Sequence, residues 1–170
     1  VWSLVAAIAA GATSLGVDVH SVGVVPTPAL AFLAGRGAFI GGIMVSASHN
    51  PDDDNGLKVL DGHGLKLDDA VEDELEQLIW RADDLGGVTN AALGRILVRT
   101  DLADEYLRHR LALAGSVHAS GLRVVLDAAN GSGSTLGPEI LRAAGPEVEV
   151  IHAEPDGVNI NAGFGATSPQ

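Results

Sequence analysis

The densest group of side chains able to do chemistry lies in segment 46–51, which reads Ser-Ala-Ser-His-Asn-Pro. It follows the continuous apolar run 38–45, which is typical of a strand covered on both faces. In open α/β sheets ligands bind beyond the carboxyl ends of the strands, so this segment is a candidate substrate site. A serine that carries a phosphoryl group needs a cation nearby to offset negative charge. Lys58, one of two lysines in the chain, follows a short loop later.

The same residues also fit a plain surface turn, in which the Ser and Asn side chains bond to backbone groups. Asn50-Pro51 is a turn-starting pair, and we interpret Gly56 as allowing a backbone shape or close approach that a Cβ would forbid. Short motifs often arise without function, so the residue types alone leave both interpretations open.

Three other patterns are weaker. Gly131-Ser132-Gly133 resembles the start of a dinucleotide fingerprint, but Leu136 stands where the third Gly is required. Asp52-Asp53-Asp54 lacks the Gly and Glu that a calcium loop needs at fixed later positions, so a solvated acidic turn is favoured. The chain contains no cysteine, so a zinc site would depend on its histidines. Five of these are scattered without zinc-site spacing: His20, His63, His109, His118 and His152.

Composition narrows the classes of partner. The 170 residues carry 10 Lys plus Arg against 22 Asp plus Glu, a net charge of -12, which predicts no nucleic-acid partner. Residues 1–17 carry no charge, but polar and Gly residues interrupt them and no basic stretch precedes them. We therefore predict a mostly buried helix over 1–13 and no membrane partner.

The remaining pattern alternates helices with apolar strands. Segment 69–72 has the spacing of a capping box, and the apolar residues that follow predict an amphipathic helix. Strand 123–127, helix 138–144 and strand 148–151 read as a βαβ unit. Further predicted elements are strands over 17–25, 38–45 and 57–60, a helix over 29–34, and a helix capped by Thr100 that ends at Gly115. The fold class predicted is α/β, with mixed, mainly parallel sheets and covering helices.

Longer motifs carry a resemblance to a known family. The run 43–51 followed by Asp-Asn-Gly-Leu-Lys at 54–58 closely resembles the phosphoserine loop of the α-D-phosphohexomutases. Segments 127–131 and 154–167 resemble the second domain of the branch that acts on glucosamine phosphate. The resemblance implies that 1–99 is phosphohexomutase domain I, N-terminally incomplete, and that 100–170 is a partial domain II. We therefore expect the chain to be part of a longer protein.

The resemblance also assigns roles. Ser48 would carry the catalytic phosphoryl group, with His49 and Lys58 as the other catalytic residues. The residues that shape the loop would be Asn50, Pro51, Asp54, Asn55 and Gly56. Mg²⁺ would be held by an oxygen of the Ser48 phosphate and by Asp residues of a separate loop that this chain does not contain.

The reaction implied converts glucosamine 6-phosphate to glucosamine 1-phosphate through a 1,6-bisphosphate, with a hexose 1,6-bisphosphate as the phosphorylating primer. The branch acting on mannose and glucose phosphates is the alternative within the enzyme class, and a catalytically incomplete binding or assembly module is the alternative outside it. A hexosamine phosphate substrate, a homodimer and a cytoplasmic location are expected by resemblance. The 170-residue chain alone is expected to be inactive.

Overall fold

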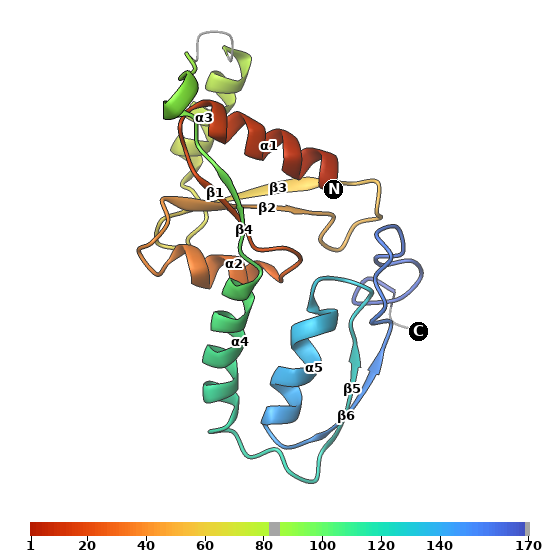
Figure 1. The fold of residues 1–170 in the computed structure, drawn as a ribbon. Helices are drawn as coiled ribbons and strands as arrows, with labels where there is room; N and C mark the ends of the chain where they lie inside the picture. The colour runs from red at the N-terminus through yellow and green to blue at the C-terminus, as the bar shows by residue number, and fades with distance from the viewer. Residues whose placement is uncertain (82–85, 169–170) are drawn as a thin grey trace. The chain divides into compact units, whose positions relative to one another are not determined.

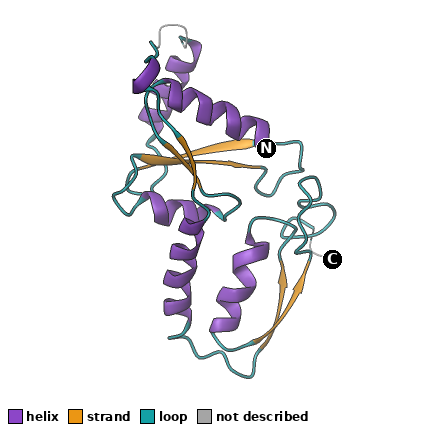
Figure 2. Ribbon diagram, viewed as in Figure 1, coloured by secondary structure: helices purple, strands orange, loops and turns teal. Residues whose placement is uncertain are grey.

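The computed structural model describes residues 1–81 and 86–168, and it alternates helices with short strands (Figures 1 and 2). Residues 82–85, inside the predicted first domain, lie outside the described residues. The elements in chain order are α1 Trp2–Ser14, β1 Val19–Ser21, α2 Thr27–Ala34, β2 Gly41–Ser46, β3 Gly56–Asp61, α3 Asp69–Trp80, the 3₁₀ helix η2 Asn90–Ala92, β4 Ile96–Val98, α4 Asp101–Ala114, β5 Arg123–Asp127, α5 Gly133–Ala143 and β6 Glu147–Ile151.

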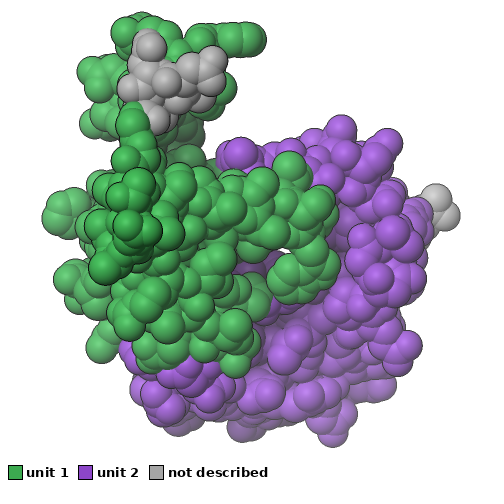
Figure 3. Space-filling view, turned by 45° about the horizontal axis from the view of Figure 1, so that its top comes forward, with its two compact units in different colours: residues 1–23, 30–45, 58–100 green, residues 24–29, 46–57, 101–170 purple. Residues whose placement is uncertain are grey.

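The chain forms two compact units, drawn in green and purple in Figure 3. The first unit contains residues 1–23, 30–45 and 58–100, and the second contains 24–29, 46–57 and 101–170. The segment that bears Ser48 therefore clusters with the C-terminal part of the chain. The division into family domains at residues 99 and 100 stays a prediction.

The first unit is built around strands that meet across a long stretch of chain. β1 pairs in parallel with β4, with Val19 opposite Ile96. Just before this pair, Asp18 accepts the backbone N–H of Arg95 at 2.8 Å, and its other oxygen lies 2.7 Å from an Arg95 side-chain nitrogen. These Arg95 contacts hold the pKa of the Asp18 carboxyl below its usual value. β2 and β3 form a second two-stranded sheet.

The second unit contains the predicted βαβ unit. β5 and β6 pair in parallel along their whole length, and α5 connects them and packs against α4. Leu102 and Tyr106 of α4 and Leu136 of α5 are buried, so they supply the apolar core. Gly137 lets α5 lie close to β5, because a Cβ there would come within 3.3 Å of the Leu126 side chain. With two parallel strand pairs and covering helices, the predicted fold class is confirmed.

Two elements predicted to be buried are more exposed than expected. α1 was predicted to be mostly buried, but Trp2 is 67% exposed and Ala9 is the one buried residue of this helix. The apolar residues surround this helix, so packing a single face against β1 leaves the others uncovered. Strand β5 has the predicted bounds but alternates between covered and exposed residues, since α5 covers one face and Val125 on the other is 63% exposed.

Several boundaries also differ from the sequence pattern. The strand predicted over 17–25 contains only the three residues of β1, and the one predicted over 38–45 begins at Gly41. α5 begins at Gly133 rather than at Pro138, because the burial of Leu136 outweighs the poor helix propensity of the Gly and Ser residues. The predicted capping box is wrong: α3 begins at Asp69 after Asp68, whose side chain makes no capping hydrogen bond.

Candidate active site

The Ser48 loop, residues 46–51, leaves the end of β2 and presents its central side chains to solvent. Ala47 is buried and anchors the loop, whereas Ser48, His49 and Asn50 are exposed. Ser48 has a φ of 58°, a left-handed backbone conformation that is uncommon for residues with a Cβ. Its N–H donates to the Ser46 hydroxyl oxygen at 2.9 Å, and the Asn50 N–H donates to the Ala47 carbonyl at 3.0 Å. The loop therefore holds an exposed serine hydroxyl on a defined backbone.

The rest of the predicted loop-shaping set continues the turn. The Asp54 N–H donates to the Pro51 carbonyl at 3.1 Å, and the Asn55 side-chain amide donates to the Asp53 carbonyl at 3.3 Å. Gly56 begins β3, and a Cβ added there would lie 3.4 Å from the Ser46 carbonyl oxygen, which is ordinary van der Waals contact. Gly56 is also absent from the described glycines with positive φ, so the reasons given for a glycine at this position were wrong.

Asn161 was given no role from the sequence, yet its side chain bonds directly to the Ser48 loop. Its amide nitrogen donates to the Ser48 carbonyl at 3.0 Å and to the Asn50 carbonyl at 2.8 Å. All of these residues belong to the second unit. Asn161 lies inside the 154–167 motif, but no local spacing could reveal a contact made across more than 110 residues.

The Asp127 carboxylate organises the turns that lead to Asn161. It accepts hydrogen bonds from the Ala129 N–H at 2.9 Å and the Gly165 N–H at 3.1 Å, and His152 Nδ1 lies 3.0 Å away. The bond from Ala129 is the main cause that lowers the pKa of Asp127, with further lowering from His152 and Gly165. The His152 ring stacks on Phe164 at a centroid distance of 3.9 Å. The end of β5 and the 152–165 segment are thus tied together.

The remaining predicted catalytic residues are less defined. Lys58 is an exposed residue of β3 in the first unit, whereas Ser48 lies in the second, so the closeness of the two stays a prediction. His49 is exposed within the Ser48 loop. The catalytic roles of Ser48, His49 and Lys58 also stay predictions.

The described residues do not by themselves supply a metal site. Among residues 1–81 and 86–168, no three His, Asp or Glu side chains are grouped so that they could hold an ion. A serine phosphate would add one kind of oxygen ligand, whereas Mg²⁺ requires near-octahedral coordination.

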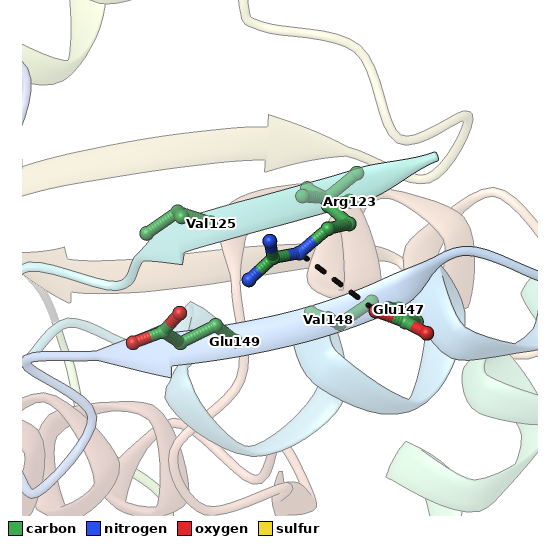
Figure 4. Close-up of a pocket in the computed structure, with 6 residues that line it drawn as sticks. Arg123, Val125, Glu147, Val148 and Glu149 are labelled. Carbon is green, nitrogen blue, oxygen red and sulfur yellow. Dashed lines mark ion pairs between the residues drawn. The ribbon is translucent and has the colours of Figure 1, made fainter. Parts of the chain in front are cut away.

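A hollow of about 360 Å³ lies on the β5–β6 sheet, and none of the predicted site residues lines it (Figure 4). Its charged lining consists of Arg123, Glu147 and Glu149, and Arg123 lies 3.8 Å from Glu147. The excess of negative charge does not suit a phosphate group. In the same described part of the chain, no helix is long and apolar enough to cross a membrane.

The fold and the serine loop define a class of protein. The family model for phosphoglucomutase/phosphomannomutase α/β/α domain I matches residues 3–85. The matched residues fit a fragment of a phosphohexomutase family protein, as the motifs implied. This family generally uses Mg²⁺.

Particular relatives are named phosphoglucosamine mutase. The chain is 48% identical over 164 residues to those of Rhodococcus opacus and Mycobacterium marinum, covering 96% of this chain. Among solved structures, a phosphoglucomutase/phosphomannomutase family protein from Burkholderia thailandensis matches with a TM-score of 0.71 and 31% identity, over 91% of this chain and 33% of that one. The chain spans 37% and 36% of the length of the two curated relatives.

Proposed function

We propose that this chain is the phosphoserine-bearing part of a phosphoglucosamine mutase, an isomerase that converts glucosamine 6-phosphate to glucosamine 1-phosphate. The observation that carries the proposal is the exposed Ser48, whose N–H and carbonyl are both hydrogen-bonded. The 48% identity to phosphoglucosamine mutases over nearly the whole chain supports the choice of sugar. The match to a solved structure named phosphoglucomutase/phosphomannomutase family protein has a lower identity, 31%, so it gives weaker support to glucose or mannose phosphate as the substrate.

The proposed chemistry is a pair of phosphoryl transfers. The bond between phosphorus and the Ser48 oxygen breaks while a bond forms to the free hydroxyl of the hexosamine phosphate. The proton of that hydroxyl ends on the serine oxygen. The bisphosphate then turns over. The bond between its other phosphorus and the sugar oxygen breaks while a bond to the Ser48 oxygen forms, and the serine proton ends on that sugar oxygen. A hexose 1,6-bisphosphate can prime the enzyme by the same step. Positioning and charge stabilisation supply nearly all the rate in such transfers.

Other residues have supporting roles in this proposal. His49 would lie beside the phosphate, and the cationic side chain of Lys58 would offset its charge. Mg²⁺ would bind an oxygen of the Ser48 phosphate together with carboxylates from outside this chain. A cytoplasmic location and a homodimer, both expected from the resemblance, belong to the same proposal, and so does a place in amino-sugar and cell-wall precursor synthesis.

The test is phosphopeptide mapping of the full-length gene product after incubation with a hexose 1,6-bisphosphate. We expect phosphate on Ser48, and modification confined to Ser46 would refute the assignment. Ser48→Ala should abolish mutase turnover, because it removes the hydroxyl that carries the phosphoryl group. The matched control is Ser116→Ala, just after α4, where the hydroxyl donates to the Leu113 carbonyl. Wild-type turnover in Ser48→Ala would refute the mechanism.

A further inference from the structure

One side-chain amide binds both sides of the exposed centre of the Ser48 loop. The two carbonyl oxygens that Asn161 contacts, those of Ser48 and Asn50, flank His49 in the sequence. A carboxamide nitrogen carries two hydrogens, so Asn161 can give one to each carbonyl. Both distances, 3.0 and 2.8 Å, are those of well-formed hydrogen bonds.

The backbone of Asn161 is hydrogen-bonded to the segment that follows β5. Its backbone N–H donates to the Ala129 carbonyl at 3.1 Å, and its own carbonyl accepts the Gly163 N–H at 2.8 Å. Its φ of 57° is left-handed, a conformation that Asn and Gly tolerate better than most residues. Ala129 in turn is bonded to the Asp127 carboxylate. The amide is therefore mounted on a hydrogen-bonded support.

This arrangement fixes the two peptide planes next to Ser48. The plane before Ser48 is held by the bond from its N–H to Ser46, and the plane after it by the bond from Asn161 to its carbonyl. Because peptide groups are planar, fixing both sets the direction of the Cα–Cβ bond, which limits the hydroxyl oxygen to the three staggered positions about that bond. Exposed loop residues without such bonds sample many directions.

We propose that Asn161 is a positioning residue that aims the Ser48 oxygen by hydrogen-bonding the backbone on either side of His49. The proposal rests on the proposed function, in which Ser48 carries the phosphoryl group. Asn161 acts through the loop backbone, because its side-chain amide donates to the carbonyl oxygens of Ser48 and Asn50. Misplacing a reacting group by about 1 Å can reduce the rate on the order of 100-fold, so a loosened loop should slow transfer.

Two substitutions separate the amide from the backbone conformation. Asn161→Asp keeps the shape and the tolerance for positive φ, but it directs carboxylate oxygens at two carbonyl oxygens. Asn161→Gly keeps the conformation available and removes the amide altogether. The control is Asn159→Ala, two residues away, whose side chain bonds within its own segment to the Asp156 N–H and the Glu154 carbonyl.

The first measurement is hydrogen exchange of the full-length gene product, which does not depend on activity. We expect the Ser48 and Asn50 amides to exchange about tenfold faster in both Asn161 variants, the ratio for losing roughly one hydrogen bond. Amides of strand 123–127 should exchange as in the wild type. Asn159→Ala should leave the Ser48 loop unchanged. Unaltered exchange of the loop in Asn161→Gly would overturn the proposal.

The second measurement is steady-state turnover of glucosamine 6-phosphate. Both Asn161 variants should lose roughly 10- to 100-fold in kcat while KM stays within about threefold, because the amide does not bind substrate. Faster loop exchange with unchanged kcat would overturn the positioning role. So would an equal loss of kcat in Asn159→Ala and Asn161→Gly. A wild-type protein whose Ser48 never acquires phosphate would instead refute the proposed function, while the exchange result would still report on the loop.

Discussion

The role of Lys58 can be tested against the only other lysine of the chain. Lys58 is exposed on β3, so replacing it with Ala should change the free energy of unfolding by no more than about 0.5 kcal/mol. If its charge stabilises the transferring phosphoryl group, the barrier should rise by about 2 to 4 kcal/mol. At about 1.36 kcal/mol per factor of ten, turnover should fall roughly 30- to 900-fold.

Lys66 supplies the matched control. Its ammonium lies 3.2 Å from a Glu72 carboxylate oxygen, and the two side chains are 69% and 40% exposed. An exposed pair of this kind contributes about 0 to 1 kcal/mol to stability, so Lys66→Ala should lower the melting temperature slightly and leave turnover unchanged. The two substitutions remove the same charge from the same unit of the protein.

The assay is coupled detection of glucosamine 1-phosphate made by the full-length gene product, with thermal unfolding measured on the same samples. Lys58→Arg should retain more of the rate than Lys58→Ala, because it keeps the positive charge. If Lys58→Ala and Lys66→Ala turn over equally fast, Lys58 is an ordinary surface lysine and the reasoning is refuted.

Three further predictions concern the stability of the fold and the activity of the 170-residue chain by itself. Hydrogen bonds, led by that from the Ala129 N–H, lower the pKa of the Asp127 carboxyl from its ordinary value of 3.8. The ionised carboxylate therefore stabilises the folded state at pH values above 3.8, and this stabilisation is lost as the pH falls through the lowered pKa. Unfolding free energy should therefore drop below about pH 4, and less steeply in Asp127→Asn, in denaturant titrations at several pH values. Gly94→Ala should destabilise by more than about 2 kcal/mol, because its Cβ would collide with the Val17 backbone, whereas Gly11→Ala, in open space within α1, should stabilise by about 0.5 to 1 kcal/mol in thermal unfolding. The purified 170-residue chain should show no mutase turnover in the coupled assay with Mg²⁺ and a bisphosphate primer, and robust turnover would show that the separate metal loop is dispensable.

Local patterns in the sequence predicted local structure well. The bounds of β5 match because a β-branched apolar run ends at Asp127, and the motif around Ser48 indicated a turn at the end of β2. Strand β4 was missed, because three residues carry little pattern of their own and their partner, β1, lies far away in the sequence. The start of α5 was missed because packing outweighed local propensity.

The same distinction applies to the candidate site. The residues of the Ser48 loop could be found because they are adjacent in sequence and carry a family motif. The contacts of Asn161 could not, because they lie 111 and 113 residues away and the 154–167 motif does not indicate what its side chains bind. Contacts between residues so far apart in the sequence arise only when the fold brings separate segments together.

The long separation between β1 and β4 has a consequence for the order of folding. Asp18 and Arg95, which flank this strand pair, are 77 residues apart, whereas β5 and β6 are joined by one short helix. Closing a loop of that length costs about 4 kcal/mol of chain entropy by the logarithmic rule. On a ribosome adding roughly 5 to 20 residues per second, β1 would wait about 4 to 15 seconds for its partner. During that interval its backbone edge is unpaired, so the nascent chain is most exposed to aggregation and to chaperones before Val98 has been made.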